Sequence, residues 1–171
     1  MTPPPDHAAL LEAAIAAHRA GRAAEAEEGY ATILAHWPGD PDALNLTGVL
    51  RLEAGDPAAA LGLFDRAIAA LPGAAAFHHH RALALEALER PGEAADALGT
   101  ALALEPGAAA WAFERARLLA LAGRLGEARE AWQGVLAATP DDMAARYNLG
   151  LVLVDLEDPA AEEVLRTVRM C

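Results

Sequence analysis

Apolar residues recur along most of the chain at intervals of three and four, the spacing that places them on one face of an α-helix. Residues 41–74 contain two such runs, separated by Gly55-Asp56-Pro57. Glycine suits the end of the first helix, aspartate can accept hydrogen bonds from the free N–H groups of the second, and proline fits its first turn. This segment predicts two helices joined by a tight turn, and no strand is expected anywhere in the chain.

The helical pattern repeats with a period of 34 residues, which shows in a recurring proline, at Pro38, Pro72, Pro106 and Pro140, and in two further side-chain series. Alanine recurs at Ala26, Ala60, Ala94 and Ala128. A large side chain recurs at Tyr30, Phe64, Leu98 and Trp132. The shared period predicts a single array of units over residues 7–171, after a disordered proline-rich segment, residues 1–6. The units are residues 7–40, 41–74, 75–108, 109–142 and an incomplete 143–171.

Small residues at fixed places predict close packing within each helix pair. Gly48 and Gly150 lie on first helices, opposite the alanine series of the second helices. In the last unit the pattern is recovered only if one residue is missing after Pro159, so that Leu165 falls on the large series. We expect Asp158-Pro159 to begin that second helix as Asp56-Pro57 does.

Places are counted from the first residue of each 34-residue unit. The unit has a small residue at place 8, alanine at place 20, a large apolar residue at place 24 and proline at place 32. This pattern resembles the tetratricopeptide repeat. Tyr147-Asn148-Leu149-Gly150 matches the first-helix signature of that family closely. The resemblance implies an all-α fold, a right-handed superhelical solenoid of about five helical hairpins. Arg81 and Arg115 depart from it, because place 7 usually holds leucine, and they predict first helices that are more exposed or differently packed.

The resemblance also implies that the first helices line a concave groove in which a partner binds. The family's groove places select Leu11, Ile15, His18, Asn45, Val49, Leu52, His79, Leu83, Glu86, Phe113, Arg117, Leu121, Tyr147, Asn148 and Leu151. These residues are mostly apolar, so the expected partner is a hydrophobic or amphipathic protein segment or peptide. Selectivity is expected from Arg117, Glu86 and Asn148.

Composition narrows the possible partners and location. The formal net charge is −12, from 25 acidic and 13 basic residues, which disfavours binding to nucleic acid or anionic lipid. No apolar run is long enough for membrane insertion or a secretory signal. The single cysteine, Cys171, excludes an intramolecular disulfide. A cytoplasmic protein is expected.

Candidate chemistry is sparse. His78, His79 and His80 are consecutive, so on a helix they diverge and cannot converge on one metal ion. The chain has no serine, and Cys171 stands at its end. We therefore expect no metal, no cofactor and no enzymatic activity.

These features predict a non-catalytic scaffold that binds a peptide or helix of a partner. The alternative is an N-terminal, substrate-recruiting repeat segment of a larger bacterial glycosyl-, sulfo- or methyltransferase, which such alanine-rich arrays resemble. Nothing in the sequence caps the final hairpin, where Val164, Leu165, Val168 and Met170 are expected to be uncovered, so a homodimer through this end is also a possibility.

Overall fold

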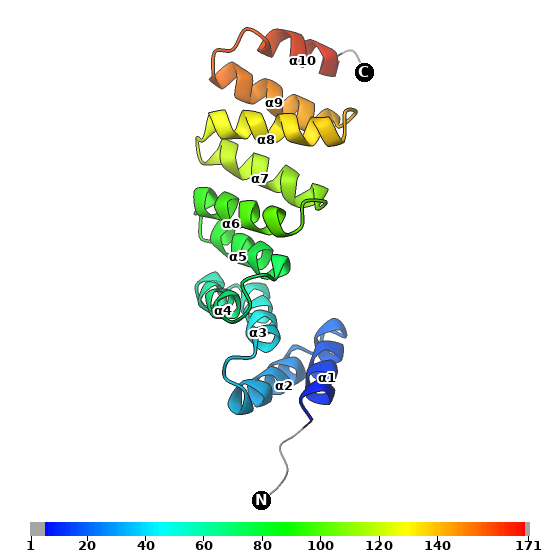
Figure 1. The fold of residues 1–171 in the computed structure, drawn as a ribbon, viewed down its shortest axis with the longest axis vertical. Coiled ribbons are helices and arrows are strands. Elements are labelled where there is room, and N and C mark those ends of the chain that lie inside the picture. The colour runs from blue at the N-terminus through cyan, green and yellow to red at the C-terminus, as the bar shows by residue number, and fades with distance from the viewer. Residues whose placement is uncertain (1–5, 170–171) are drawn as a thin grey trace, which may run out of the picture. The chain divides into compact units, whose positions relative to one another are not determined.

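The computed structural model describes residues 6–169 (Figure 1). Every regular element in this range is an α-helix, which confirms the all-helical prediction. The helices are α1 (His7–Arg19), α2 (Ala23–His36), α3 (Pro41–Glu53), α4 (Pro57–Ala70), α5 (Ala75–Ala87), α6 (Pro91–Leu104), α7 (Ala109–Leu121), α8 (Leu125–Ala138), α9 (Met143–Asp155) and α10 (Ala161–Arg169). Residues 1–5 of the predicted disordered segment, and Met170 and Cys171, lie outside the described range.

The helices fall into two compact units, and the boundary lies inside α5, after Ala84. In the first unit α1 packs on α2, α2 on α3 and α3 on α4. In the second unit α6 packs on α7, α7 on α8, α8 on α9 and α9 on α10. Within each compact unit these helices therefore pack on their neighbours in sequence, as the predicted hairpin repeat requires.

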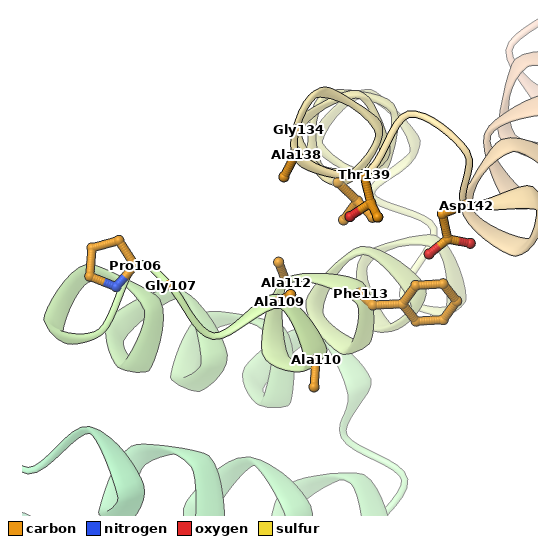
Figure 2. A pocket seen from close by; sticks show the side chains of 11 residues that line it. Pro106, Gly107, Ala109, Ala110, Ala112, Phe113, Gly134, Ala138, Thr139 and Asp142 are labelled. Atoms are coloured by element: carbon orange, nitrogen blue, oxygen red, sulfur yellow. The ribbon is translucent and has the colours of Figure 1, made fainter.

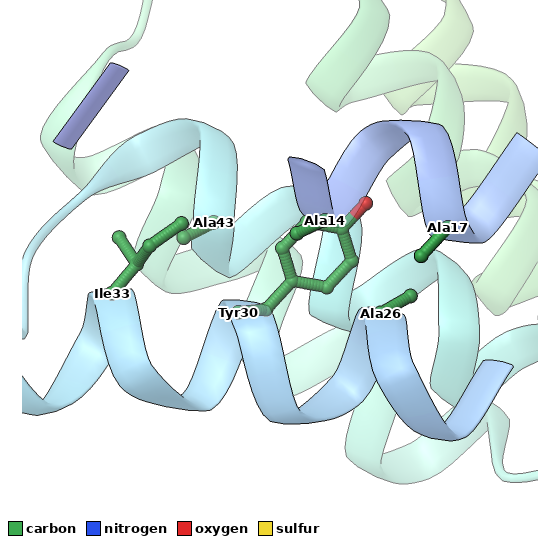
Figure 3. Close-up of a cluster of buried hydrophobic side chains, with 6 residues drawn as sticks. All are labelled: Ala14, Ala17, Ala26, Tyr30, Ile33 and Ala43. Atoms are coloured by element: carbon green, nitrogen blue, oxygen red, sulfur yellow. The ribbon is translucent and has the colours of Figure 1, made fainter. Parts of the chain in front are cut away.

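The two periodic side-chain series form the core. All four alanines of the series are fully buried, and Tyr30, Phe64, Leu98 and Trp132 are at most 2% exposed. Figure 3 shows the first of these clusters, where Tyr30 and Ile33 of α2 lie between alanines of α1 and α3. The alanines let neighbouring helices approach, and the large side chains then fill the space between them.

Glycine at place 8 lies directly against the large series. A Cβ atom on Gly48 would lie 2.5 Å from Phe64 Cε1, and one on Gly150 would overlap Leu165. Leu165 thus takes the place of Phe64 one residue early, as the predicted gap requires, and it is partly buried rather than uncovered. The prediction that Asp158-Pro159 begins the helix is wrong. Asp158 accepts a hydrogen bond from the Ala160 amide (2.9 Å), and α10 begins at Ala161.

The turn between the two helices of each hairpin requires a left-handed backbone. Gly21, Gly55 and Gly123 adopt it with φ of 72°, 80° and 72°, as expected for glycine after a helix. At the same place the third and fifth units carry Glu89 (φ 57°) and Glu157 (φ 54°). A side chain with a Cβ atom is strained in this region.

Replacing Glu89 or Glu157 with glycine is therefore expected to raise the free energy of unfolding by about 1 kcal/mol, since the strain exceeds the entropy that glycine loses. Urea unfolding followed by circular dichroism measures the change. Glu105→Gly, at an exposed residue after α6 with φ of −136°, is the control and should not stabilise the protein. A destabilised Glu89→Gly variant would contradict this account of the turn.

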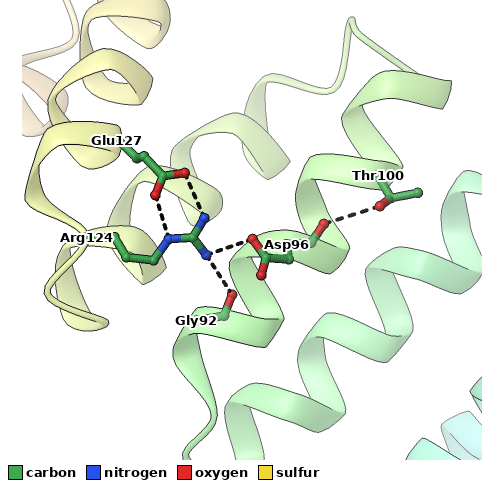
Figure 4. Close-up of polar contacts among 5 residues, drawn as sticks. All are labelled: Gly92, Asp96, Thr100, Arg124 and Glu127. Carbon is green, nitrogen blue, oxygen red and sulfur yellow. Dashed lines mark hydrogen bonds and ion pairs between the residues drawn. The ribbon is translucent and has the colours of Figure 1, made fainter.

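Helix starts use two kinds of residue. Asp6, Asp40, Asp56 and Asp142 each accept backbone N–H bonds at the start of a first or second helix. Asp6, which we assigned to the disordered segment, thus caps α1. Where arginine precedes the second helix it pairs with a glutamate three residues on. Arg124 donates to both oxygens of Glu127 (2.8 and 2.7 Å) and to Asp96 of α6 (2.7 Å), as Figure 4 shows.

The two arginines at place 7, in the third and fourth repeat units, make different contacts. Arg81 donates to Asp65 of α4 (2.7 Å). Arg115 instead lies over Gly99 of α6, with its Nε 3.2 Å from the position of a Cβ atom there. That Nε is buried and has no hydrogen-bond partner. Gly99 thus provides the space that the arginine side chain occupies.

Candidate functional site

Large apolar side chains are exposed on the first helices of two hairpins, α7 and α9, in the second compact unit. Tyr147, Leu151 and Val154 of α9 are 48%, 42% and 51% exposed, and Leu121 at the end of α7 is 65% exposed. The α9 residues are four and three positions apart, so they share one face of the helix. Since α7 and α9 are in contact, we call these four residues the α7–α9 apolar surface.

The opposite face of α9 is also apolar. Leu149, Val152 and Leu153 are buried against the neighbouring helices. A helix that only had to pack would need apolar residues on one face and polar residues on the other. The exposed residues of α9 therefore exceed what the fold requires, and three of the four residues of the surface, Leu121, Tyr147 and Leu151, are among those selected from the sequence.

The predicted polar groups of the second unit are occupied by contacts within the chain. Arg117 donates to Glu86 (2.5 Å) and to Glu114 (2.9 Å), and the hydrogen bonds to Glu114 and Glu86 raise the pKa of Arg117. Asn148 donates from Nδ2 to the Ala144 carbonyl (2.9 Å). A ligand carboxylate would have to compete with two glutamates for Arg117, so this cluster favours a cationic or neutral partner.

Phe113 is partly buried against its own hairpin. Its ring meets Trp132 edge-to-face, with the ring centroids 4.7 Å apart at 82°. The same side chain lines a pocket of about 580 Å³ between the first turn of α7 and the last turn of α8 (Figure 2). Most of the pocket wall is alanine, glycine and valine, with Thr139 and Asp142 as its polar side chains. The sequence analysis did not predict this pocket.

In the first unit, three predicted residues line shallow hollows. Leu11 and Ile15 of α1 border a hollow of about 490 Å³. Ile15 and His18 border a second one of about 380 Å³, shared with Leu46 and Glu53 of α3. His18 Nε2 lies 3.1 Å from the Glu53 carboxylate.

The remaining predicted residues of the first unit differ in exposure. Leu83 is 37% exposed, whereas Val49 and Leu52 are partly buried against the core formed by Phe64 and its neighbours. His79 is also partly buried. Leu83 is thus the most accessible apolar member of this group.

Asn45 was selected as a surface residue, but it is only 5% exposed. Its Oδ1 accepts a hydrogen bond from His80 Nδ1 (2.8 Å), and the His80 ring lies 5.7 Å from the ring of Phe64. Burial, followed by the nearby charge of His79, lowers the pKa of His80 to about 4. The family pattern could not show that His80 covers Asn45.

The three consecutive histidines do not converge. His78 Nε2 lies 2.9 Å from the Pro72 carbonyl, while His80 bonds to Asn45. Among residues 6–169, no group of three histidine, cysteine or carboxylate side chains is arranged to hold a metal ion. None of the helices within residues 6–169 has both the length and the apolar composition of a membrane span.

Stacked helical hairpins with a 34-residue period and a buried alanine series define the chain as an α-helical repeat protein. A model of the tetratricopeptide repeat matches residues 11–75, 80–133 and 122–168, so the chain belongs to the tetratricopeptide repeat family. The first-helix signature at Tyr147 and Gly150 and the spacing of the units are thereby explained.

Solved structures with the same fold include a protein named YrrB, described as having an unusual peptide-binding site. It has a TM-score of 0.86 at 22% identity, over 95% of this chain and 84% of its own. MamA from Desulfovibrio magneticus RS-1 has a TM-score of 0.80 at 21% identity, over 98% and 96%. A mutant O-GlcNAc transferase from Thermobaculum terrenum has a TM-score of 0.63 at 30% identity, over 66% of this chain and 22% of that enzyme. No curated protein matches the sequence.

Proposed function

We propose that the protein is a non-catalytic scaffold that binds a peptide or helix of a partner protein on the α7–α9 apolar surface. The observation that carries the proposal is the exposure of Leu121, Tyr147, Leu151 and Val154 on two adjacent helices. Covering apolar surface contributes about 25 cal/mol per Å². Grouped apolar side chains of this kind commonly mark a protein interaction site.

The family membership supports this reading. Repeat arrays present the same face of successive hairpins to a partner, which gives an extended surface from short units. YrrB, which shares the fold, is described as having a peptide-binding site. For the present chain the corresponding proposal is a peptide or helix that lies across the first helices.

Charge indicates the chemistry of the partner. The chain carries a net charge of −12, and Arg117 is held between two glutamates beside the proposed site. An amphipathic segment with apolar residues on one face and basic residues around them would bury its apolar face and be attracted by the net negative charge of the chain. An acidic segment would be repelled.

The proposal predicts that Tyr147→Asp combined with Leu151→Asp weakens partner binding at least about a hundredfold, because two apolar contacts are lost and two charges are desolvated. The partner is first identified by crosslinking and mass spectrometry in the native extract and then titrated by calorimetry. Both sites are exposed, so the circular dichroism melting curve should change little.

The matched control is Gln133→Asp with Ala137→Asp, an exposed pair with the same spacing on α8. It adds the same charge to a second helix and should leave the affinity unchanged. Equal loss in both double variants would indicate a general charge effect, and unchanged binding in the Tyr147 and Leu151 variant would reject the surface as the binding site.

A second candidate function is the recruitment of substrates to a transferase domain. The similarity to the O-GlcNAc transferase, at 30% identity over 66% of this chain, favours it over other enzyme-linked roles. The coding sequence beyond the Cys171 codon tests it directly. An open reading frame that continues into a transferase domain would support this function, and an immediate stop codon would remove it.

A further inference from the structure

The pocket between α7 and α8 arises because the fourth repeat unit has small residues where other units have large ones. The key position is Ala112, at place 4 of its unit. The other units carry larger side chains there, namely Leu10, Leu44, His78 and Arg146. A pocket of about 580 Å³ at this position is thus a local departure from the repeat pattern.

The second repeat unit shows what normally fills this space. Leu44, two periods before Ala112, is 1% exposed and packs against Ala67 and Phe77. Two repeat periods later, the position of Ala67 is occupied by Val135 and the position of Phe77 by Ala145. Across the fourth and fifth repeat units, alanine therefore stands in place of both a leucine and a phenylalanine, and valine in place of alanine restores only part of that volume.

The mouth of the pocket has also lost its cover. In the second repeat unit, Arg66 Nη2 donates to the Pro38 carbonyl (3.1 Å) and so spans the corresponding opening. Two periods later these positions are Gly134 and Pro106, both of which line the pocket. A Cβ atom on Gly134 would meet no other atom within 4 Å, so packing does not require glycine there. Glycine inside a helix is unfavourable relative to alanine, and at this position no long side chain spans the mouth of the pocket.

The size and the walls of the pocket fit a large apolar group. An engineered apolar cavity of about 150 Å³ already binds benzene. The pocket has more room than that, its walls are mainly alanine, glycine and valine, and the ring of Phe113 lies at one side (Figure 2). The Asp142 carboxylate accepts the Ala145 amide (2.9 Å), which leaves apolar contact as the main source of binding.

We propose that this Ala112 pocket receives one large apolar side chain, leucine or phenylalanine, of a partner polypeptide. The occupant is inferred from the second and third repeat units, where Leu44 and Phe77 close the corresponding space. The inference rests on the proposed scaffold function, since the side chain belongs to a bound partner. It adds a second, more specific contact that is separate from the α7–α9 apolar surface.

The direct test uses small probes in place of the partner. N-acetyl-phenylalanine amide and N-acetyl-leucine amide are titrated into the ¹⁵N-labelled protein, with N-acetyl-glycine amide as a probe that lacks the side chain. The first two should cause saturable shifts at the amides of Ala112, Gly134 and Ala138, and the third should cause none. Absence of saturable shifts with the large probes would overturn the proposal. Shifts produced by raising the protein concentration alone would also overturn it, because the occupant would then be a second copy of this chain.

Two independent variants close the pocket. Ala112→Leu fills the pocket from its base. Gly134→Arg covers the mouth of the pocket, as Arg66 covers the corresponding opening in the second repeat unit. Each should weaken probe binding at least tenfold, by analogy with the filled second unit, whereas the controls Ala137→Leu and Gly134→Ala should leave it unchanged. Probe binding that survives in both closing variants would refute the site.

The probe experiment separates this inference from the proposed function, because it requires no partner. If Tyr147→Asp with Leu151→Asp abolishes partner binding but the probes fail to bind wild-type protein, the scaffold function stands and the pocket is rejected. If the probes bind and the partner is unaffected by that double variant, the pocket stands and the proposed surface is rejected.

Discussion

Replacing Phe64 with alanine is expected to lower the free energy of unfolding by about 3–5 kcal/mol. Phe64 is fully buried between the two helices of its hairpin and the next, with Ala60 and Ala84 in the same cluster. Its ring fills the space that Gly48 leaves open, so the deletion creates a cavity that the rigid helix pairs can close only in part.

The loss is measured by urea unfolding with circular dichroism detection. Leu71→Ala is the control, because Leu71 is 46% exposed, and it should change the free energy of unfolding by less than about 1 kcal/mol. A loss below about 1 kcal/mol for Phe64→Ala would show that the large periodic series does not hold the hairpins together.

Acidification is expected to destabilise the protein through His80. Burial lowers the pKa of His80 from 6.5 to about 4 in the folded chain. The neutral side chain is the form that the fold accommodates, so this contribution is complete above pH 6.5 and is lost as the pH falls towards 4. The loss at low pH is at most about 3 kcal/mol, and it is reduced because the side chain is partly exposed.

The matched variant is His80→Gln, whose amide can still donate to Asn45 but does not titrate in this range. Urea unfolding of wild type and variant at a series of pH values isolates the contribution of His80, because every other titrating group is common to both. The stability of the wild type should fall more steeply than that of the variant between pH 6.5 and 4. Parallel curves would contradict the buried, neutral state of His80.

The fold could be predicted well from the sequence, because the repeat allows each position to be compared with the equivalent positions in the other units. Gly48 and Phe64 identified one place of close helix contact, and the same spacing, with its one-residue gap, correctly placed Leu165 against Gly150. The start of α10 could not be predicted in this way. The missing residue changes the turn, and Asp158 then caps the turn instead of the helix.

The proposed binding surface was predicted less completely than the fold, because family places indicate the direction of a side chain but not what lies above it. Tyr147 and Leu151 are exposed as expected, whereas Asn45 is covered by His80, which belongs to the next unit. Likewise the sequence could not show that Glu86 and Arg117 bind each other. The burial of Asn45 and the pairing of Glu86 with Arg117 depend on contacts between neighbouring repeat units, which a repeat pattern does not encode.

The Ala112 pocket was missed although its signal is in the sequence. Small residues occur at two places, Ala112 and Gly134, where the second unit has Leu44 and Arg66. If only one of the two residues were small, the space would still be filled by a leucine at the first place or covered by an arginine at the second. Only the structure shows that the two positions face the same volume.

The central claim, that a partner binds on the exposed face of the first helices, is tested most directly by site-specific photo-crosslinking. A benzophenone amino acid is placed at Tyr147 on α9 or at Gln133 on the exposed side of α8. We expect a crosslinked partner band from the Tyr147 position and none from Gln133. A band from Gln133 with none from Tyr147 would contradict the account, because the partner would then lie on the second helices.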